Sequence, residues 1–537
     1  MPATRSHDLV ILGGGLAGLT LALQLRRRMP DIDVLVLDRR RHPVPQAAHK
    51  VGESSVEIAA HYFGKVLGLE ELLARRQLKK FGFRFFFSDG AERIEDVVEL
   101  GASTFLRTPS WQLDRGIFEN DLGTIVREHG VRFLDGATVR DFSLGDGDVP
   151  HRVRYYDADG THEVDARWLV DASGRAGLVK RRLGLAQGND HDVNAVWFRI
   201  GARIDVDDWS TDPEWRARCD PPQRWLSTNH LVGAGYWVWL IPLSSGSHSI
   251  GIVADAKLHP LDGMNTFDKA MAWLEQRQPL LFRELDAKRT ALQDFAFFKR
   301  FSYGCRQVFD GTRRWALTGE AGLFLDPFYS PGGDFIAISN TFVTDLVALD
   351  RAGSRVAARA EIYQRLYFSF YEAMLPIYDG QYGLFGDPEV LPVKVLWDYT
   401  YYWGVLCQLF FQDRLTDLPT LGRLQKPLMH AQQLNLEMQR FLRAWGDRSA
   451  RRNGRAMLDQ AGLPWFAELN RGLADRLNDA GFAERMSATF AQLSALAGQI
   501  VERAMREHPE LDATGVRGLL GSQAELDREP MLFDATS

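Results

Sequence analysis

Residues 8–38 read DLVILGGGLAGLTLALQLRRRMPDIDVLVLD, and this stretch decides the fold. An apolar run, a glycine turn, a helical pattern and a second apolar run follow one another, which predicts a strand, a helix and a parallel strand. Gly13, Gly15 and Gly18 give the spacing G-x-G-x-x-G in the turn, and Asp38 ends the second strand. In such a unit the glycines let a pyrophosphate approach the helix N-terminus, and the acid accepts hydrogen bonds from a ribose. The stretch therefore predicts a dinucleotide-binding fold.

FAD and NAD both fit this turn, and three later segments favour FAD because they resemble motifs of two-domain flavoproteins. Residues 168–175 (WLVDASGR) are an apolar strand that ends at an acid, and residues 315–322 (WALTGEAG) bring a second acid to a strand end. That second acid is Glu320, where flavoproteins usually have Asp. Residues 112–115 (QLDR) precede a helical pattern. They resemble the segment of these flavoproteins in which an arginine before a helix lies near the flavin phosphates. The predicted cofactor-binding residues are Gly13, Gly15, Ala17, Gly18, Asp38, Arg39, Arg115, Asp171, Gly319, Glu320, Pro327, Gly332 and Gly333.

The composition is that of an ordinary globular protein. The chain has 537 residues, a hydrophobic content of 45% and a formal net charge of −6. Acidic and basic residues are interspersed, so neither nucleic acid nor an anionic membrane is expected as a partner. The three cysteines are far apart in sequence and predict neither a disulfide framework nor a metal site. With no signal segment and no apolar run of membrane-spanning length, the expected location is the cytoplasm.

The patterns along the chain predict an α/β fold of the two-domain FAD-binding type, Rossmann-like and similar to the aromatic hydroxylases. Between the flavoprotein motifs lie alternating apolar runs that predict an antiparallel substrate-side sheet, and the C-terminal pattern is helical. The expected segments are FAD-binding residues 1–190, with substrate-side strands at 80–110, the sheet at 191–300, a returning FAD-binding segment at 301–350, a helical substrate lid at 351–520 and a tail at 521–537.

Two distant segments narrow the family. Residues 237–242 read WVWLIP, and residues 79–85 read KKFGFRF with GESS upstream at 52–55. Together they resemble the flavin-dependent halogenases that act on phenols and pyrroles, whose pattern is Trp-x-Trp-x-Ile-Pro and a lysine two residues before a glycine. By this resemblance Trp237 and Trp239 line a passage for hypohalous acid. A buried strand with aromatic residues on one face would explain WVWLIP without a catalytic role.

Lys80 begins the pattern Lys-x-Gly-x-x-Phe, and the resemblance makes it the catalytic amine. That chemistry needs a primary amine that hydrogen-bonds hypohalous acid or becomes a haloamine, and apolar neighbours tune such an amine. Lys79 falls one residue out of register, on the opposite strand face. The alternative interpretation is that Lys79 and Lys80 are a solvated charge pair.

Residues 326–334 (DPFYSPGGD) are expected close to the flavin ring. In halogenases a serine, a small residue and a glycine present successive backbone N–H groups to the halide. Ser330 and Gly332 fit that pattern, but Pro331 between them has no N–H to donate. Gly332 and Gly333 offer a substitute pair of donors for the halide. The proline is also typical of flavin hydroxylases and of reductases of isoprenoid chains.

The resemblance thus implies an enzyme of secondary metabolism that uses reduced FAD and O2 to halogenate an electron-rich aromatic substrate through hypohalous acid and Lys80. The substrate is a small aromatic molecule, free or tethered to a carrier protein, and a separate flavin reductase supplies reduced FAD. The catalytic prediction comprises Lys80, Trp237, Trp239 and Ser330, with no metal. Two alternatives stay open: an FAD-dependent aromatic monooxygenase, which Pro331 favours, and a flavin-dependent reductase of polyene or isoprenoid chains.

Overall fold

The computed structural model describes residues 5–47, 49–520 and 530–533. They form two compact units. Unit 1 contains the residues up to Gln77, Leu113–Asp190 and Ser302–Glu372, and unit 2 contains Leu78–Gln112, His191–Phe301 and the residues from Ala373 onward. Each unit is thus assembled from segments that are distant in sequence.

Unit 1 is built on a sheet whose central strands are parallel, in the order β18-β19-β10-β1-β2-β7, with β8 and β9 extending it beside β10. The predicted strand-helix-strand unit is confirmed. β1 is fully buried over its last four residues, which explains why the sequence there is apolar without alternation. The strands of unit 1 are β1 (Arg5–Leu12), β2 (Val34–Asp38), β7 (Arg132–Asp135), β8 (Thr138–Ser143), β9 (His151–Asp157), β10 (Gly160–Asp171), β11 (Ala186–Gln187), β17 (Gly304–Cys305), β18 (Phe309–Asp310) and β19 (Trp315–Leu317).

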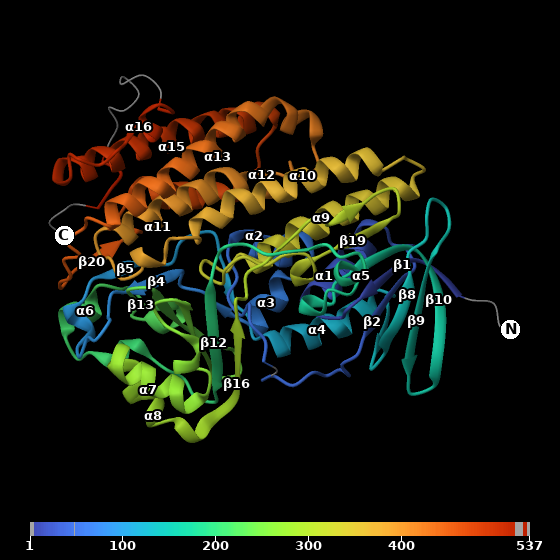
Figure 1. Cartoon of the computed structure of the whole chain (residues 1–537), viewed down its shortest axis with the longest axis horizontal. Helices are drawn as coiled ribbons and strands as arrows, with labels where there is room; N and C mark the ends of the chain where they lie inside the picture. Colours follow the sequence, from blue (N-terminus) through green and yellow to red (C-terminus); the bar gives the residue numbers. More distant parts are fainter. Residues whose placement is uncertain (1–4, 48, 521–529, 534–537) are drawn as a thin grey trace. The chain divides into compact units, whose positions relative to one another are not determined.

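The helices of unit 1 are α1 (Leu16–Arg28), α2 (Glu57–His61), α3 (Glu70–Arg76), α4 (Arg115–Glu128), α5 (Leu178–Arg182) and α9 (Gly332–Arg351), while α10 (Ala357–Met374) begins in unit 1. α1 directly follows the glycine turn, and α1 and α4 pack against strands of this sheet (Figure 1). α1 and α9 contact each other, so the turn after β1 and the start of α9 belong to one packed body. A hydrogen bond from the Asn340 amide to the Ala17 carbonyl, at 3.2 Å, joins the two helices.

Unit 2 contains the expected antiparallel sheet, in the order β16-β12-β15-β14-β13-β4-β5-β20. Two pairs, β13 with β4 and β5 with β20, are parallel. The strands of unit 2 are β3 (Leu78–Lys79), β4 (Phe83–Phe86), β5 (Glu99–Gly101), β6 (Trp111–Gln112), β12 (Val193–Ile200), β13 (Thr228–Gly233), β14 (Tyr236–Pro242), β15 (His248–Asp255), β16 (Leu292–Lys299) and β20 (Met457–Asp459).

The helical C-terminal extension is also present, and its long helices α13 and α15 lie side by side (Figure 1). The helices of unit 2 are α6 (Pro213–Ala217), α7 (Phe267–Arg277), α8 (Pro279–Asp286), α11 (Val390–Tyr401), α12 (Gln408–Phe411), α13 (Leu418–Gly446), α14 (Pro464–Arg471), α15 (Asp479–Glu507) and α16 (Thr514–Arg517). A π-helical segment, Tyr402–Cys407, joins α11 to α12. None of the helices in the described ranges has the length and hydropathy that crossing a membrane would require.

Part of the tail expected at 521–537 lies outside the described residues, namely 521–529 and 534–537. Within the described part, Met531 and Phe533 are buried. The Met531 N–H donates a hydrogen bond to Gln499 at 2.8 Å, and its carbonyl accepts one from the Trp465 indole at 3.1 Å. Residues 530–533 are therefore packed onto the helical extension.

Candidate functional site

The glycine turn of unit 1 leaves room for a ligand at the N-terminus of α1. An added Cβ would lie 2.3 Å from the Ala172 carbonyl oxygen at Gly13 and 2.0 Å from the Gly13 oxygen at Gly18, so both positions exclude a side chain. An added Cβ at Gly15 would meet no protein atom within 4 Å. Backbone N–H groups at a helix start attract a phosphate. The turn therefore fits the diphosphate of FAD.

Asp38 lies beside this turn, as the sequence predicted. Its carboxylate accepts hydrogen bonds from the N–H of Gly14 at 2.6 Å and from the N–H of Arg40 at 2.7 Å. Arg39 is exposed next to it. Asp38 thus stabilises the turn, and its carboxylate still has lone pairs that can accept a hydrogen bond from a ribose hydroxyl.

Arg115 begins α4 and is held by a cluster that the sequence interpretation missed. Its guanidinium donates to the Val51 carbonyl at 2.7 Å and to the Glu119 carboxylate at 2.6 Å, and Glu119 also forms an ion pair with Lys50. Burial is the main cause that lowers the pKa of Lys50, followed by the charge of Arg115, while the charge of Asp38 opposes this shift. The i, i+4 spacing of Arg115 and Glu119 was the available signal.

Arg115 also supplies an independent sign of fit to an anionic cofactor. Its Nε is buried and has no hydrogen-bond partner among the described residues. A buried guanidinium nitrogen without a partner is costly, and a phosphate oxygen is a group that satisfies it. The chemistry of this position agrees with the predicted role of Arg115.

The second and third flavoprotein motifs occupy neighbouring turns of unit 1. Asp171 is fully buried, and its carboxylate accepts the N–H groups of Ser173 at 2.9 Å and Val179 at 2.7 Å. Burial raises the pKa of Asp171, and these hydrogen bonds oppose the shift. Asp171 therefore shapes the turn before α5. Glu320 forms an ion pair with Arg175 at 2.9 Å, a partner that the longer acid reaches.

Gly319 has a positive φ of 60° and packs against the glycine turn. An added Cβ there would lie 3.1 Å from the Cβ of Ala17. The small residues at both positions thus allow the two turns to meet, which places these two predicted residues together.

The loop 326–334 runs into α9 in a strained conformation. Tyr329 and Ser330 have φ values of 64° and 55°, in the left-handed region that non-glycine residues rarely adopt. The Ser330 N–H donates to the Pro327 carbonyl at 2.8 Å, so it is occupied within the loop. In the described part of the chain, no acceptor receives a hydrogen bond from the N–H of Gly332 or Gly333. These two donors open α9 where the sequence predicted a substitute halide site.

α9 is fixed against α2 at this point. The Asp334 carboxylate accepts the Ala59 N–H at 2.9 Å, and an added Cβ at Gly333 would lie 2.8 Å from the Cβ of Ala59. Glycine at 333 is therefore required by close packing against α2.

In unit 2, Lys80 and Lys79 differ sharply. Lys80 is 4% exposed, whereas Lys79 is exposed. The Lys80 Nζ lies 3.4 Å from the centroid of the Phe83 ring, and its backbone N–H donates to the Ser110 carbonyl at 2.9 Å. Gly82 has a φ of 78°, which turns the chain between the lysine and β4. Lys80 thus lies as an ammonium or amine on an aromatic face.

His230 belongs to the same cluster, and no sequence motif pointed to it. Its ring stacks on Phe85 with centroids 4.6 Å apart and meets Phe83 edge-on at 5.2 Å. Its Nδ1 is 3.3 Å from the Arg84 carbonyl. Burial lowers the pKa of His230 to about 3, and the charge of Lys80 adds to the shift. His230 is therefore a neutral imidazole near Lys80 at ordinary pH.

The two tryptophans of WVWLIP are buried in β14. Their rings are 5.6 Å apart, and Trp237 lies 5.3 Å from the His230 ring. The Trp237 indole donates to the Tyr382 hydroxyl and the Trp239 indole to Ser249, each at 3.1 Å. Gly251 on β15 makes room for Trp239, because a Cβ there would lie 2.1 Å from the indole. Trp237 therefore joins the aromatic cluster around Lys80.

The aromatic block of the helical extension reaches this cluster through Tyr399. Its ring lies 6.3 Å from Phe83 and 4.5 Å from Trp403. Asp398 is 3% exposed, and its carboxylate accepts a hydrogen bond from the Lys394 ammonium at 2.6 Å. Among the described residues, no group of three or more His, Cys, Asp and Glu side chains has the arrangement of a metal site.

Comparison with known proteins agrees with these features. Residues 6–248 match the model of the FAD-binding domain. A flavin-dependent halogenase of Dictyostelium discoideum, chlA, is 26% identical over 436 residues, covering 74% of this chain and 70% of that protein. A 1H-pyrrole-2-carbonyl-[peptidyl-carrier protein] brominase of Pseudoalteromonas luteoviolacea is 28% identical over 347 residues, covering 62% and 75%.

Solved structures show the same fold. Halogenase PltM, in complex with phloroglucinol and FAD, superposes with a TM-score of 0.65 at 17% identity and covers 96% of this chain and 98% of its own. The myxobacterial chondrochloren halogenase CndH gives a TM-score of 0.55 at 22% identity, over 70% of this chain and 83% of its own.

Proposed function

We propose that this chain, an FAD-dependent oxidoreductase related to the flavin-dependent halogenases, adds a halogen to an electron-rich aromatic ring through the side chain of Lys80. The observation that carries the proposal is the burial of Lys80 in an aromatic cluster that includes Trp237. An ordinary strand lysine is exposed, as Lys79 is.

The residues of unit 1 hold the cofactor and the halide in this proposal. The open space at Gly15 and the guanidinium of Arg115 hold the diphosphate of FAD, and Asp38 holds the ribose. Reduced FAD with O2 supplies the oxidation that turns halide into hypohalous acid. The N–H groups of Gly332 and Gly333 bind the halide as the first donors of α9, where the helix dipole also favours an anion.

The residues of unit 2 deliver the oxidised halogen. Trp237 and Trp239 are buried aromatic side chains that neither protonate nor hydrolyse hypohalous acid, and they exclude water from its passage. The Lys80 Nζ takes up the oxidised halogen, by a hydrogen bond to hypohalous acid or as a haloamine, and keeps it beside the ring that attacks the halogen. His230, neutral at ordinary pH, adds no positive charge beside Lys80.

The substrate we propose is a small aromatic ring, free or tethered to a carrier protein. The support comes from relatives whose names state that they halogenate a pyrrole-2-carbonyl group on a peptidyl-carrier protein, at 28% and 24% identity. Reduced FAD comes from a separate flavin reductase in this proposal.

The test uses the FAD-loaded protein, a flavin-reducing system, bromide or chloride, and a β-diketone that captures hypohalous acid, followed by a panel of phenols and pyrroles. Lys80→Ala and Lys80→Met should bind FAD and release hypohalous acid as the unchanged protein does, while halogenation of the ring falls by about a hundredfold or more. Lys79→Ala is the matched control and should halogenate normally.

The main alternative is an aromatic hydroxylase, for which Pro331 is the specific support. The named relatives above are halogenases, which makes this alternative the weaker one. It predicts oxygenated product without halide and full activity in Lys80→Ala. A chain reductase predicts instead that substrate is reduced without consumption of O2.

A further inference from the structure

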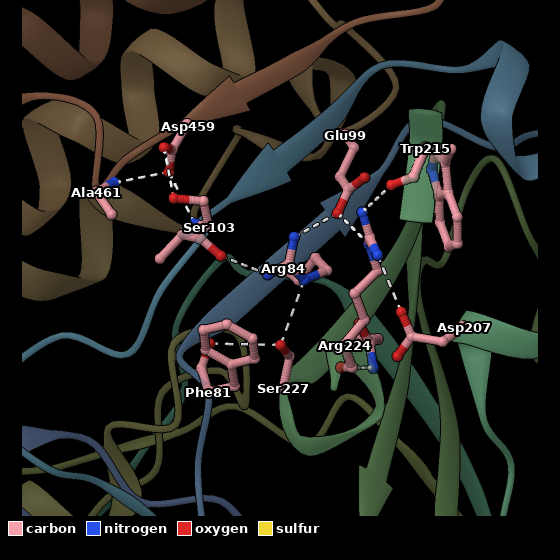
Figure 2. Close-up of polar contacts among 12 residues, drawn as sticks. Phe81, Arg84, Glu99, Ser103, Asp207, Trp215, Arg224, Ser227, Asp459 and Ala461 are labelled. Atoms are coloured by element: carbon pink, nitrogen blue, oxygen red, sulfur yellow. Dashed lines mark hydrogen bonds and ion pairs between the residues drawn. The ribbon is translucent and has the colours of Figure 1, made fainter. Parts of the chain in front are cut away.

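Four charged side chains are buried together in unit 2, next to β4 (Figure 2). Arg84 on β4, Glu99 on β5 and Arg224 in the turn Arg224–Leu226 are 0% exposed, and Asp207 is largely buried. One oxygen of Glu99 accepts from both arginines, at 2.8 Å from the Arg224 Nε. Arg224 also contacts Asp207 at 2.9 Å. Two cations and two anions thus balance.

Every nitrogen of the Arg84 guanidinium is engaged, so its position is fixed. One Nη contacts Glu99, and the other donates to the Ala102 carbonyl at 2.6 Å. The Nε donates to the Ser227 hydroxyl at 3.4 Å. β5 leaves space for this guanidinium, since an added Cβ at Gly101 would lie 3.0 Å from its Nη1.

Arg224 is fixed in the same way. Its second Nη donates to the Trp215 carbonyl at 2.6 Å, and its guanidinium carbon lies 3.9 Å from the centroid of the Trp215 ring. The network therefore anchors β4, β5 and the segments around 207, 215 and 224 to one another as a rigid polar core.

This core reaches the lysine segment through Ser227 and Phe81. The Ser227 hydroxyl donates to the Phe81 carbonyl at 3.4 Å, and the Arg84 guanidinium carbon lies 5.4 Å from the Phe81 ring (Figure 2). Phe81 directly follows Lys80 in the chain. The Lys80 Nζ, however, lies over the ring of Phe83. One set of side chains in the segment 80–84 thus faces the buried charges, and the other forms the lysine site.

Stability alone does not account for such a network. Burying charges costs desolvation energy, and replacing buried ion pairs by apolar residues of similar volume is often neutral or stabilising. In this network every guanidinium nitrogen has a partner, and the network contacts residues on both sides of the short turn at Gly82. It therefore gives that turn a defined position, whereas glycine by itself would leave the backbone there free to move.

We propose that Arg84, Glu99, Arg224 and Asp207, acting through Ser227 and Phe81, are positioning residues that hold the Lys80 Nζ where it captures oxidised halogen. The inference rests on the proposed halogenase function. In the capturing step the neutral amine reacts with hypohalous acid to give a haloamine and water. The halogen–oxygen bond and one N–H bond break, the nitrogen–halogen bond forms, and the proton leaves with the hydroxide.

The experiment follows oxidised bromine in the FAD-loaded protein during flavin reduction with bromide and O2, without organic substrate. Free hypobromous acid is captured by a β-diketone, and bromine held on the protein as haloamine is measured by its oxidation of iodide after rapid desalting. The difference between the unchanged protein and Lys80→Ala is the amount held at Lys80. Ser227→Ala removes the link to Phe81, and Gly101→Ala displaces the Arg84 guanidinium.

Both variants should hold about tenfold less bromine at Lys80, and free hypobromous acid should rise by the same amount, with FAD content and total oxidised bromine unchanged. Ser103→Ala is the matched control, because the Ser103 hydroxyl donates to Asp459 at 2.7 Å and not to one of the four buried charges (Figure 2). It should hold bromine normally.

Three results would overturn the inference in different ways. If Ser227→Ala and Gly101→Ala hold as much bromine at Lys80 as the unchanged protein, the network has no positioning role. If Lys80→Ala itself holds as much bromine as the unchanged protein, the proposed role of Lys80 fails and the inference fails with it. A fall in FAD content or in total oxidised bromine would assign the network to folding alone.

Discussion

At Gly15, in the dinucleotide turn, the space beside the backbone is free of protein atoms, and this gives a direct prediction about FAD binding. An added Cβ there meets no protein atom, and φ is −85°, so Gly15→Ala should leave the FAD-free protein as stable as before. The methyl group would occupy space proposed for the cofactor and cost about 1–3 kcal/mol, or about ten- to a hundredfold in FAD affinity. Titration of the FAD-free protein with FAD measures this, and unfolding temperature is the control.

Gly18→Ala provides the contrast, because its Cβ would lie 2.0 Å from the Gly13 oxygen. That variant should lower the unfolding temperature of the FAD-free protein itself. Unchanged FAD affinity in Gly15→Ala would place the diphosphate elsewhere.

Among single residues, the sequence indicated those that belong to a recognisable motif. It missed those whose role depends on contacts between distant segments. Lys80 was predicted by resemblance, and its burial distinguishes it from Lys79. His230 was invisible, because it comes next to Lys80 only through the pairing of β13 with β4, which are distant in sequence. Arg84 and Arg224 were also missed, since the acids that pair with them come from other segments.

At the element scale, α9 gives a prediction about the halide. In Gly333→Ala the added Cβ lies 2.8 Å from the Cβ of Ala59, so the start of α9 must shift away from α2. Displacing one of two aligned N–H donors should cost about 1.5 kcal/mol. We therefore expect the bromide concentration for half-maximal hypobromous acid formation to rise by about tenfold.

The compensating pair is Ala59→Gly with Gly333→Ala, which removes the steric conflict and should restore the bromide dependence. Ala59→Gly alone costs about 0.5–1 kcal/mol of stability and should leave the bromide dependence near that of the unchanged protein. A double variant as impaired as Gly333→Ala would show that the close contact does not set the halide site.

Elements with a strong local pattern were predicted well. The unit β1-α1-β2 follows from the apolar run at residues 9–12, three glycines and a helical period, all within residues 8–38. The parallel pairing of β13 with β4 was not predictable, because sequence patterns give the faces of strands and not their partners. The strand order within each sheet was hidden for the same reason.

At the scale of the whole molecule, buried neutral histidines should weaken the fold in acid. His248 on β15 is 1% exposed, and its Nδ1 accepts the Ile204 N–H at 3.1 Å, which a protonated ring cannot do. Burial lowers the pKa of His248 to about 3, with a smaller contribution from the charge of Arg203. The pKa of His230 is also lowered to about 3 by burial, followed by the charge of Lys80. Both native pKa values thus lie below the ordinary value of 6.5 that the unfolded chain has.

The sign of the effect follows from proton binding. Between pH 6.5 and about 3 the unfolded chain binds a proton at each of these histidines and the native state does not, so the free energy of unfolding falls as the pH falls through this window. The slope is up to about 1.4 kcal/mol per pH unit for each histidine.

His248→Gln removes one titrating group. Although it is less stable at pH 7, it should lose stability less steeply between pH 6 and 4 than the unchanged protein, by about that slope. Urea unfolding at several pH values measures the difference, with a substitution of the exposed His129, His129→Gln, as the control. Equal slopes in His248→Gln and the unchanged protein would mean that His248 is protonated in the folded state, and that the Ile204 hydrogen bond does not hold its ring neutral.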